Sequence, residues 1–454
     1  MAVSINPPPS VRAVMERLWA HGQAAYVVGG SVRDAILERE ADDWDLATDA
    51  RPDRLLAIFP GAVYENRFGT VAVREGTAQH EVTTFRSDHE YADFRRPHHV
   101  EFGDDIVLDL ARRDFTVNAI AWGAQPAVDA GAPAPMPALV DPFDGIADNG
   151  ARRLRAVGDP GTRFREDALR MLRAARLAAV LGFEIDPPTI EAIRENAGLV
   201  AHVSGERTAA ELEKLLQADR PSVGLRLMAD TGLLGIISPE LGAQLGVPQN
   251  KIPGDDLFWH TIRAVDAVPA SRPTVRLAAL LHDVGKPSTI DDGPFRGHEV
   301  VGAEMAEALL ERLHMPKAVV ERVVHLVRQH MFQYDPDWGD AGVRRFIQRV
   351  GVDAIDDLFA LRAADSIGSG LPADAGALDE LRARVAAELE ASVVLDRSKL
   401  AVHGDDLMTE LHVPAGPHLG RILDALLERV IADPALNDRA ALLLLAESML
   451  ADDQ

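Results

Sequence analysis

The chain has 454 residues, with 47 lysines and arginines against 71 aspartates and glutamates, and it contains no cysteine. The absence of cysteine excludes disulfides, thiolate metal sites and cysteine nucleophiles. A net charge of −24 argues against a general nucleic-acid-binding protein, whose surface is typically basic, and 47% hydrophobic residues indicate a folded protein of several domains. No run of 18 apolar residues occurs, so we expect no membrane-spanning segment. The absence of cysteine fits the cytoplasmic location that we expect.

The N-terminal 150 residues begin with alternating helix and strand signals. Residues 11–22 have the apolar periodicity of an amphipathic helix, and residues 24–30 form a β-branched run that ends in two glycines. Residues 31–40 predict a helix with Ser31 at its N-cap. Residues 43–49 predict a short strand with alternating acids.

Further strand signals follow before the composition changes. Residues 69–75 and 79–86 predict two strands, joined by a hairpin across residues 76–77. Residues 87–105 are polar, rich in arginine and histidine, and aperiodic, so we expect a mobile loop. Residues 123–138 are rich in alanine, proline and glycine and predict a loop or an insertion.

Strand signals nearly vanish after residue 150, and helical periodicity dominates the rest of the chain. The architecture predicted is α+β, a small α/β head followed by a long all-α body. A proline- and glycine-containing segment at 246–256 marks one boundary inside that body. The expected domains are 1–150, 151–250, 251–375 and an acidic C-terminal helical region at 376–454.

The charge is unevenly distributed along the chain. Residues 1–150 carry 13 basic and 24 acidic side chains, and residues 351–454 carry 8 and 20. Residues 151–176, by contrast, hold eight arginines and three acids. A solvated helix face would have this composition, and so would a local anion-binding surface.

The head contains two signals for phosphate chemistry. Gly29, Gly30 and Ser31 lie between a predicted strand and a predicted helix, where glycines permit close approach of a phosphate. Asp43 and Asp45 are two residues apart, so on a strand both carboxylates would point to one face. Two such carboxylates can hold two Mg²⁺ ions for phosphoryl or nucleotidyl transfer. Either signal alone is more often a structural turn, and their combination is more specific.

This combination resembles a known family. YVVGGSVRDAILERE followed by DWDLATD is similar to the signature of the polymerase-β-like nucleotidyltransferases, in the class II group of CCA-adding tRNA nucleotidyltransferases and bacterial poly(A) polymerases. The segments that follow in order also match, and they are NRFGTVAV, EVTTFR, ARRDFTVNAIAW, DPFDGIADNGARRLRAVGDP, RFREDALRMLRAARLAAVLGF and SGERTAAELEKLL. The resemblance covers about residues 20–220. Asn149 departs from the family pattern, at a position away from any expected catalytic group.

The resemblance implies roles for the matching residues. Asp43 and Asp45 would bind Mg²⁺, and Glu81 is a weaker candidate for a third carboxylate. Gly29, Gly30 and Arg33 would hold the triphosphate, and Arg113 would contact the nucleotide. Asp167 and Arg170 would read the base, because an aspartate accepts from an exocyclic amine and an arginine donates to ring nitrogens. We expect these two at positions i and i+3 of one helix face, continued by Arg173 and Arg176 toward phosphates or tRNA.

The implied reaction is addition of CCA to the tRNA 3′ end from CTP and ATP, without a nucleic-acid template and with release of pyrophosphate. Poly(A) polymerase and CC-only or A-only addition are alternatives within the same class. The acidic C-terminus ESMLADDQ favours tRNA addition, because the poly(A) branch usually carries a basic tail. A metal phosphohydrolase whose head only binds nucleotide, and a non-catalytic RNA-binding module, are alternatives from other classes.

A second group of chemically active residues lies between residues 260 and 365. His282 and Asp283 are adjacent at the end of an apolar helix, with His260 upstream and Asp365 downstream. Neutral imidazoles with carboxylates suit Mn²⁺, Fe²⁺ or Ni²⁺, although a lone His-Asp pair is more often a structural hydrogen bond. The pattern resembles the HD superfamily of metal-dependent phosphohydrolases, which implies those four residues as ligands. The remaining candidates, for a second metal ion, are His298, His325 and His330. A helical support for tRNA without catalysis is the alternative.

Overall fold

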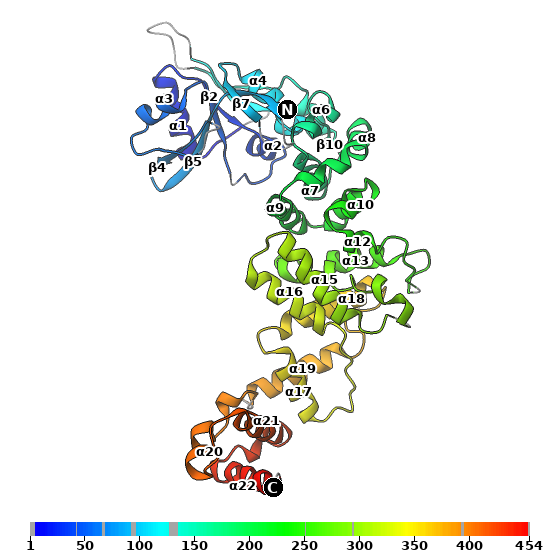
Figure 1. The fold of residues 1–454 in the computed structure, drawn as a ribbon. Helices are drawn as coiled ribbons and strands as arrows, with labels where there is room; N and C mark the ends of the chain where they lie inside the picture. Colours follow the sequence, from blue (N-terminus) through cyan, green and yellow to red (C-terminus); the bar gives the residue numbers. More distant parts are fainter. Residues whose placement is uncertain are drawn as a thin grey trace. The chain divides into compact units, whose positions relative to one another are not determined.

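The computed structural model describes residues 5–452, apart from residues 42, 66–68, 92–96, 127–134, 250, 293–294 and 392–394. The chain separates into two compact units, unit 1 comprising residues 1–242 with 312–314, and unit 2 comprising residues 243–311 with 315–454. The predicted fold class is confirmed, because an α/β head with a mixed sheet is followed along the chain by helices (Figure 1). No helix within the described ranges is long and apolar enough to cross a membrane.

A seven-stranded mixed sheet forms the head of unit 1. Its order is β3-β4-β5-β2-β1-β8-β9, with β2 and β5 parallel and the other neighbours antiparallel. The strands are β1 (Ala25–Val28), β2 (Leu46–Thr48), β3 (Val63–Tyr64), β4 (Thr70–Glu75), β5 (Ala78–Thr84), β8 (Ala121–Ala124) and β9 (Ala138–Val140).

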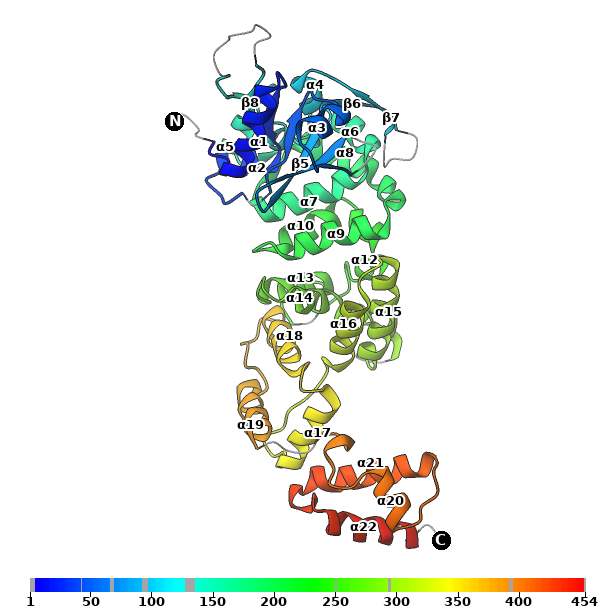
Figure 2. The same cartoon turned by 90° about the vertical axis from the view of Figure 1, so that its left-hand side faces the viewer.

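Both faces of this sheet are covered. Along β1, Ala25 and Val27 belong to an apolar cluster with residues of α1 (Pro9–Ala20) and α3 (Pro52–Ile58). Tyr26 and Val28 point the other way, into a cluster with residues of α4 (Ile106–Ala111). Figures 1 and 2 show α1 and α3 against the strands. A central strand buried on both faces fixes the register of its neighbours, and β1 and β2 lead directly into the site.

The structure confirms some predicted elements and corrects others. The hairpin across residues 76–77 is confirmed, with Glu75 opposite Ala78. Ser31 is not an N-cap: the cap of α2 (Gly30–Ile36) is Gly29, and the Ser31 hydroxyl donates to the carbonyl of Val28 at 3.3 Å. The two residues of the D-x-D pair, Asp43 and Asp45, precede β2 instead of lying within it.

The predicted mobile loop at 87–105 is wrong for most of its length. β6 (Arg86–Tyr91) and β7 (Pro97–Phe102) form an antiparallel pair, and only residues 92–96 fall outside the described part of the chain. Both segments are polar in sequence and pair through their backbones. They therefore lack the apolar alternation by which a strand is recognised in a sequence. Of the loop expected at 123–138, residues 127–134 lie outside the described residues, and β8 and β9 occupy its two ends.

Helices complete unit 1 after the sheet. They are α5 (Gly145–Gly150), α6 (Pro160–Glu166), α7 (Leu169–Leu181), α8 (Pro187–Asn196), α9 (Gly205–Leu216), α10 (Pro221–Asp230), α11 (Leu233–Ile237) and α12 (Pro239–Gly242), with a two-residue parallel pair β10 (Arg153–Leu154) and β11 (Glu184–Ile185). α7 packs against α9 and α10, and Gly224 allows the close approach, because a Cβ there would lie 2.6 Å from the carbonyl oxygen of Ala175.

Unit 2 is helical within its described residues. Its helices are α13 (Leu257–Ala267), α14 (Pro273–Leu281), α15 (His298–Arg312), α16 (Lys317–Gln329), α17 (Asp340–Val350), α18 (Ile355–Gly368), α19 (Leu378–Glu390), α20 (Gly404–Glu410), α21 (Pro417–Ala432) and α22 (Arg439–Asp452). α13 and α18 lie close together at Gly368. A Cβ at this position would lie only 2.9 Å from the carbonyl oxygen of His260, so glycine permits the close approach. This approach brings Asp365 of α18 beside His260.

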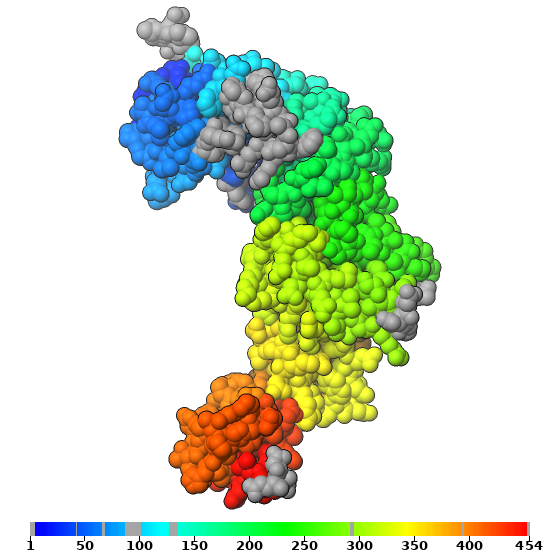
Figure 3. All heavy atoms as spheres, viewed as in Figure 1, coloured from blue at the N-terminus to red at the C-terminus, as the bar shows by residue number. Residues whose placement is uncertain are grey.

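The C-terminal helices α20, α21 and α22 enclose an apolar core of their own, and they form the orange-to-red lobe of Figure 3. Arg344 of α17 links this lobe to the helices before it. Its buried guanidinium donates to the carbonyl of Ile431 at 2.6 Å and pairs with Glu388 at 3.0 Å. A substitution that removed only the carboxylate of Glu388 would leave this buried charge without its acid, which costs several kcal/mol.

Candidate functional site

A polar pocket of about 900 Å³ opens in unit 1 between the head sheet and the helices α7 and α9. It is lined by all eleven residues that the sequence predicted for nucleotide and Mg²⁺ binding, which are Gly29, Gly30, Arg33, Asp43, Asp45, Glu81, Arg113, Asp167, Arg170, Arg173 and Arg176. The structure therefore brings the predicted residues together, while the role of each remains a prediction.

Three carboxylates form one wall of the pocket. Asp43 and Asp45 precede β2, and Glu81 lies on β5, which pairs in parallel with β2 from Leu46 to Val82 onward. Burial raises the pKa of Asp45, and the neighbouring Asp43 raises it further. Burial also raises the pKa of Glu81, followed by the effect of Asp45. Carboxylates that destabilise one another in this way are suited to share a cation.

Gly29 and Gly30 form the glycine turn of the pocket, and Arg113 lies directly beside it. Gly29 has φ +79°, a conformation that side-chain-bearing residues rarely adopt, and a Cβ there would meet Nη1 of Arg113 at 2.8 Å. Arg33 is held by two hydrogen bonds to Asp34, at 2.9 and 2.8 Å, and by one to Asn118 at 2.7 Å. Arg113 donates to Asp109 at 3.3 Å, so both arginines are oriented before any ligand binds.

The opposite wall is built from arginines that are paired with acids. Glu211 of α9 accepts from Nε of Arg173 at 3.2 Å and from Nε of Arg176 at 2.6 Å. Asp114 accepts from Arg173 at 2.9 Å, and although burial raises its pKa, the Arg173 guanidinium lowers it to about 2. The sequence predicted that Arg173 and Arg176 reach toward phosphates or the tRNA, and the structure places them in an ion-pair network at the pocket wall.

The predicted base-reading pair needs one correction. Asp167 is not on one helix with Arg170, because it has an extended backbone (φ −145°, ψ 105°) between α6 and α7. Its Oδ1 accepts from the backbone N–H of Leu169 at 3.1 Å, a local turn that replaces the helical hydrogen bond. Arg170 lies in α7 and pairs with Glu166 at 2.7 Å. Both residues still line the pocket.

Sequence reasoning missed the residues of α9 that support this wall. Arg207 donates to Oδ2 of Asp167 at 2.7 Å, Glu211 holds the two arginines of α7, and Lys214 lines the pocket. Their spacing of four and three residues is the repeat of one helix face. The segment SGERTAAELEKLL was recognised, and this spacing was the available signal.

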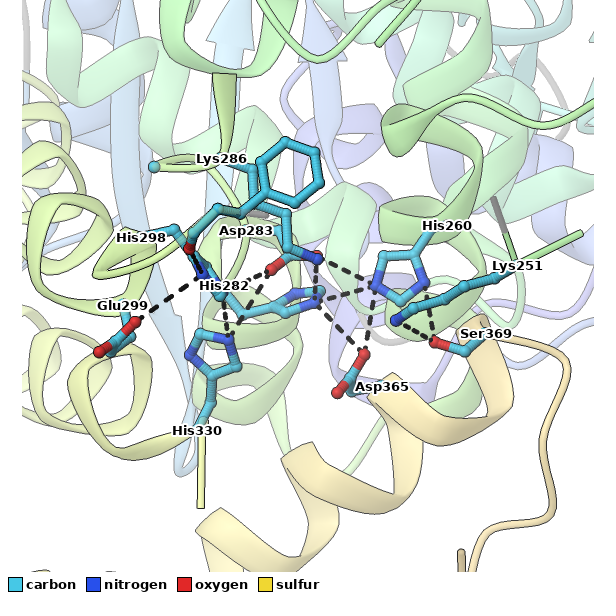
Figure 4. Close-up of polar contacts among 12 residues, drawn as sticks. Lys251, His260, His282, Asp283, Lys286, His298, Glu299, His330, Asp365 and Ser369 are labelled. Carbon is cyan, nitrogen blue, oxygen red and sulfur yellow. Dashed lines mark hydrogen bonds and ion pairs between the residues drawn. The ribbon is translucent and has the colours of Figure 1, made fainter. Parts of the chain in front are cut away.

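Unit 2 contains the second predicted site. Figure 4 shows that His260 of α13, His282 and Asp283 after α14, and Asp365 of α18 converge. Nε2 of His260 lies 3.1 Å from Nε2 of His282 and 3.2 Å from Oδ2 of Asp283. Oδ1 of Asp365 lies 3.3 Å from Nε2 of His260. The four ligands expected from the sequence are therefore adjacent and buried.

Two further histidines face the other oxygen of Asp283. Nε2 of His298 lies 3.3 Å and Nε2 of His330 lies 3.7 Å from Oδ1, and the two Nε2 atoms are 3.2 Å apart. Oδ1 of Asp283 is buried and has no hydrogen-bond partner in the described part of the chain. His325 lies apart from this group, with Nε2 2.7 Å from the carbonyl oxygen of Val350. His260, His282, Asp283, His298, His330 and Asp365 are called the His/Asp cluster below.

Backbone carbonyls fix the orientation of three imidazoles. Nδ1 of His282 lies 2.7 Å from the carbonyl of Ala279, Nδ1 of His298 2.7 Å from that of Phe295, and Nδ1 of His330 2.6 Å from that of Val327. Because a carbonyl only accepts, each Nδ1 carries the proton and each Nε2 turns a lone pair toward the cluster. Several lone pairs and carboxylate oxygens facing one another are stabilised by cations between them.

The carboxylates of the cluster are kept ionised. Burial raises the pKa of Asp283, but His282 and Lys286 lower it well below its usual range. Burial would lower the pKa of His260, while hydrogen bonds with Asp283 and Asp365 raise it. Lys286 donates to Oδ2 of Asp283 at 2.7 Å.

Family models match three consecutive parts of the chain. The Poly A polymerase head domain matches residues 25–155, the probable RNA and SrmB-binding site of polymerase A matches residues 182–245, and the HD domain matches residues 240–370. Nucleotidyltransferases and HD proteins generally use divalent metal ions.

Curated proteins and a solved structure show the same similarity. A CCA-adding enzyme of Bacillus licheniformis is 32% identical over 434 residues, covering 94% of this chain and 95% of that protein. A CCA-adding enzyme of Geobacillus sp. is 46% identical over 229 residues, and the aligned part spans 54% of that protein's length. The crystal structure of the Bacillus stearothermophilus CCA-adding enzyme in complex with CTP has a TM-score of 0.71 and 29% identity, covering 99% of this chain and 100% of that chain.

Proposed function

The chain belongs to the family of CCA-adding enzymes, and we propose that it adds CCA to the 3′ end of tRNA from CTP and ATP without a nucleic-acid template. The family resemblance and the enzyme class predicted from the sequence are confirmed by these relatives. The observation that best supports nucleotide addition is that three carboxylates, a glycine turn and a row of oriented arginines converge on one pocket.

The pocket walls suit the two ends of a nucleoside triphosphate. The arginines Arg33 and Arg113 beside the glycine turn present cations to a triphosphate, and arginine matches phosphate oxygens with a planar set of donors. In the transfer, the tRNA 3′-hydroxyl loses its proton to water and its oxygen forms a bond to the α-phosphorus. The bond between the α-phosphorus and the oxygen bridging to the β-phosphorus breaks, and pyrophosphate leaves with that oxygen. Arginines held by acids before binding lose little freedom when the phosphates arrive.

The carboxylate wall fits Mg²⁺. Asp43 and Asp45, with Glu81 as a third candidate, offer hard oxygen ligands whose mutual repulsion a divalent cation relieves. Bound there, Mg²⁺ would lower the pKa of the attacking hydroxyl and neutralise charge on the leaving pyrophosphate. The role of the protein is to hold these carboxylates directly before β2 and on its parallel neighbour β5.

Asp167 and Arg170 are proposed to read the base. Asp167 retains acceptor capacity on both oxygens beyond its bonds to Leu169 and Arg207, which suits the exocyclic amine of C or A. Arg170 uses Nη1 and Nη2 for Glu166 and the carbonyls of residues 163 and 112. Three of its five N–H donors are used in these bonds, so its Nε–H and one Nη2–H are left to meet a ring nitrogen.

We propose that the His/Asp cluster of unit 2 hydrolyses phosphoesters with divalent metal ions. His260, His282, Asp283 and Asp365 fit one ion, and Asp283 with His298 and His330 fit a second. The inward Nε2 lone pairs and the unpartnered Oδ1 of Asp283 support this. Mn²⁺, Fe²⁺ or Ni²⁺ suits such a set, and the ion would activate water for attack on phosphorus.

The remaining proposals concern organisation. We propose a catalytic head at 1–150, a nucleotide- and RNA-binding helical region at 151–250, an HD domain at 251–375 and an acidic helical region at 376–454. The matches at 25–155, 182–245 and 240–370 support the first three. A cytoplasmic location also stays a prediction.

One assay tests the transferase function. The full chain is incubated with tRNA that lacks its 3′ CCA, with labelled CTP and with ATP, and the products are sequenced. We expect C, C and A added in that order. A tail of A residues would instead indicate a poly(A) polymerase, products ending in CC a CC-only enzyme, and phosphate release without incorporation a hydrolase with a nucleotide-binding head.

A further inference from the structure

A second hollow lies in unit 2 beside the His/Asp cluster. It is a groove of about 690 Å³, lined by residues of the 246–256 segment and by Trp259. Lys251 connects the groove with the cluster. It lines the groove, and its Nζ donates to the hydroxyl of Ser369 at 2.8 Å. That hydroxyl lies 3.5 Å from Nδ1 of His260 (Figure 4). The ammonium group is thus one hydroxyl away from a histidine of the cluster.

Asp365 is the most exposed residue of the His/Asp cluster. His282, Asp283 and His330 are at most 1% exposed, whereas Asp365 is 8% exposed and Lys251 is exposed. A ligand from solvent would therefore meet Lys251 and Asp365 before the deeper histidines.

Lys251 also differs from the other cations near the cluster. Lys286 pairs with Asp283 at 2.7 Å, and Arg362 pairs with Asp365 at 3.2 Å, so each is committed to a carboxylate of the cluster. Among the described residues, no carboxylate lies within ion-pair distance of Lys251, whose bond is to a neutral hydroxyl. A lysine in such a position is a point charge available to an anion.

We propose that residues 248–249 and 251–256 are the substrate-binding wall of the His/Asp cluster, in which Lys251 binds the phosphate of a phosphoester and the groove beside Trp259 receives the organic group. The proposal rests on the hydrolase function proposed above. The groove volume falls in the range of small-molecule sites. The indole of Trp259 suits a flat, aromatic group such as a nucleobase. Lys251 is a binding residue and not a metal ligand, because an ammonium group has no lone pair to donate.

The test separates metal binding, phosphate binding and turnover. The full chain is loaded with Mn²⁺, its metal content is measured by mass spectrometry, and binding of inorganic phosphate and of AMP is measured by calorimetry. Lys251→Ala should bind both ligands ~10-fold more weakly with unchanged metal content, as expected for one lost charge-assisted contact. Trp259→Ala should weaken AMP binding and leave inorganic phosphate unaffected. Lys251→Arg should restore phosphate binding.

The matched control is Lys317→Ala, because Lys317 is a lysine of unit 2 with an 88% exposed side chain that pairs with Glu321. It should leave both ligands unaffected. Equal phosphate binding by wild type and Lys251→Ala would overturn the assignment, as would loss of bound metal in Lys251→Ala or no phosphate binding by the loaded wild type. Hydrolysis of p-nitrophenyl phosphate is scored separately, so that phosphate binding without turnover contradicts the hydrolase function alone.

Discussion

The ion-pair network of α9 yields a prediction for Glu211→Gln. Glu211 is 7% exposed and accepts from Arg176 at 2.6 Å and from Arg173 at 3.2 Å. Glutamine keeps the shape and removes the charge, so Arg176 loses the carboxylate it pairs with, while Arg173 retains Asp114. A hydrogen bond to a charged group contributes about 1.5–3 kcal/mol.

The expected loss is about 2–3 kcal/mol of unfolding free energy, below the 3–5 kcal/mol typical of breaking a fully buried pair. The lower figure follows from solvent access, because the side chains of Arg176 and Arg173 are 18% and 34% exposed. For a unit of this size, each kcal/mol lowers Tm by about 2–4 °C, so the unfolding transition of unit 1 should fall by about 4–12 °C.

Calorimetry of the full chain would measure this shift. Glu213→Gln is the matched control, because Glu213 is an exposed residue of the same helix. A double-mutant cycle with Arg176→Gln isolates the pair, and the two changes together should cost less than their sum. A Tm equal to that of Glu213→Gln, or additive effects in the cycle, would refute the reasoning.

Three further predictions follow from the two sites. Asp43→Asn should reduce nucleotide incorporation by ~10³-fold or more, because it removes a ligand of the proposed Mg²⁺, while Asp53→Asn on the exposed start of α3 should leave the rate unchanged in the same assay. Arg207→Ala should release the carboxylate of Asp167, which Arg207 holds at 2.7 Å, and so reduce the preference for CTP over UTP by ~10-fold. The preference is measured as the ratio of the two kcat/KM values. An unchanged ratio would show that Arg207 has no part in base selection. His330→Ala should lower bound Mn²⁺ from about two ions to about one per chain, because His330 faces Asp283. His325→Ala is the control and should keep both ions, because His325 bonds to a backbone carbonyl. Equal metal content in the two variants would contradict the second ion.

Local chemistry in the sequence determined much of the candidate transferase site. The glycine turn, the D-x-D pair and the segment with Arg170, Arg173 and Arg176 are contiguous motifs, and these residues all line one pocket. Such motifs are readable because their function requires particular residue types at fixed short spacings. The hairpin across residues 76–77 was readable for the same reason, since a two-residue connection and alternating side chains are local features.

Tertiary structure decided which residues pair across the fold. Arg173 and Arg176 have the same sequence signature whether they face phosphate or an acid, and only the packing of α7 against α9 brings Glu211 to them. His325 and His330 are likewise equivalent candidates in sequence. His325 lies within α16 and faces Val350, whereas His330 lies five residues later, at the end of the helix, and faces Asp283. Contacts between residues far apart in the chain depend on how helices pack, which periodicity does not specify. The sequence therefore determined the chemistry available to this protein, and the packing of its helices decided which charges remain free to act.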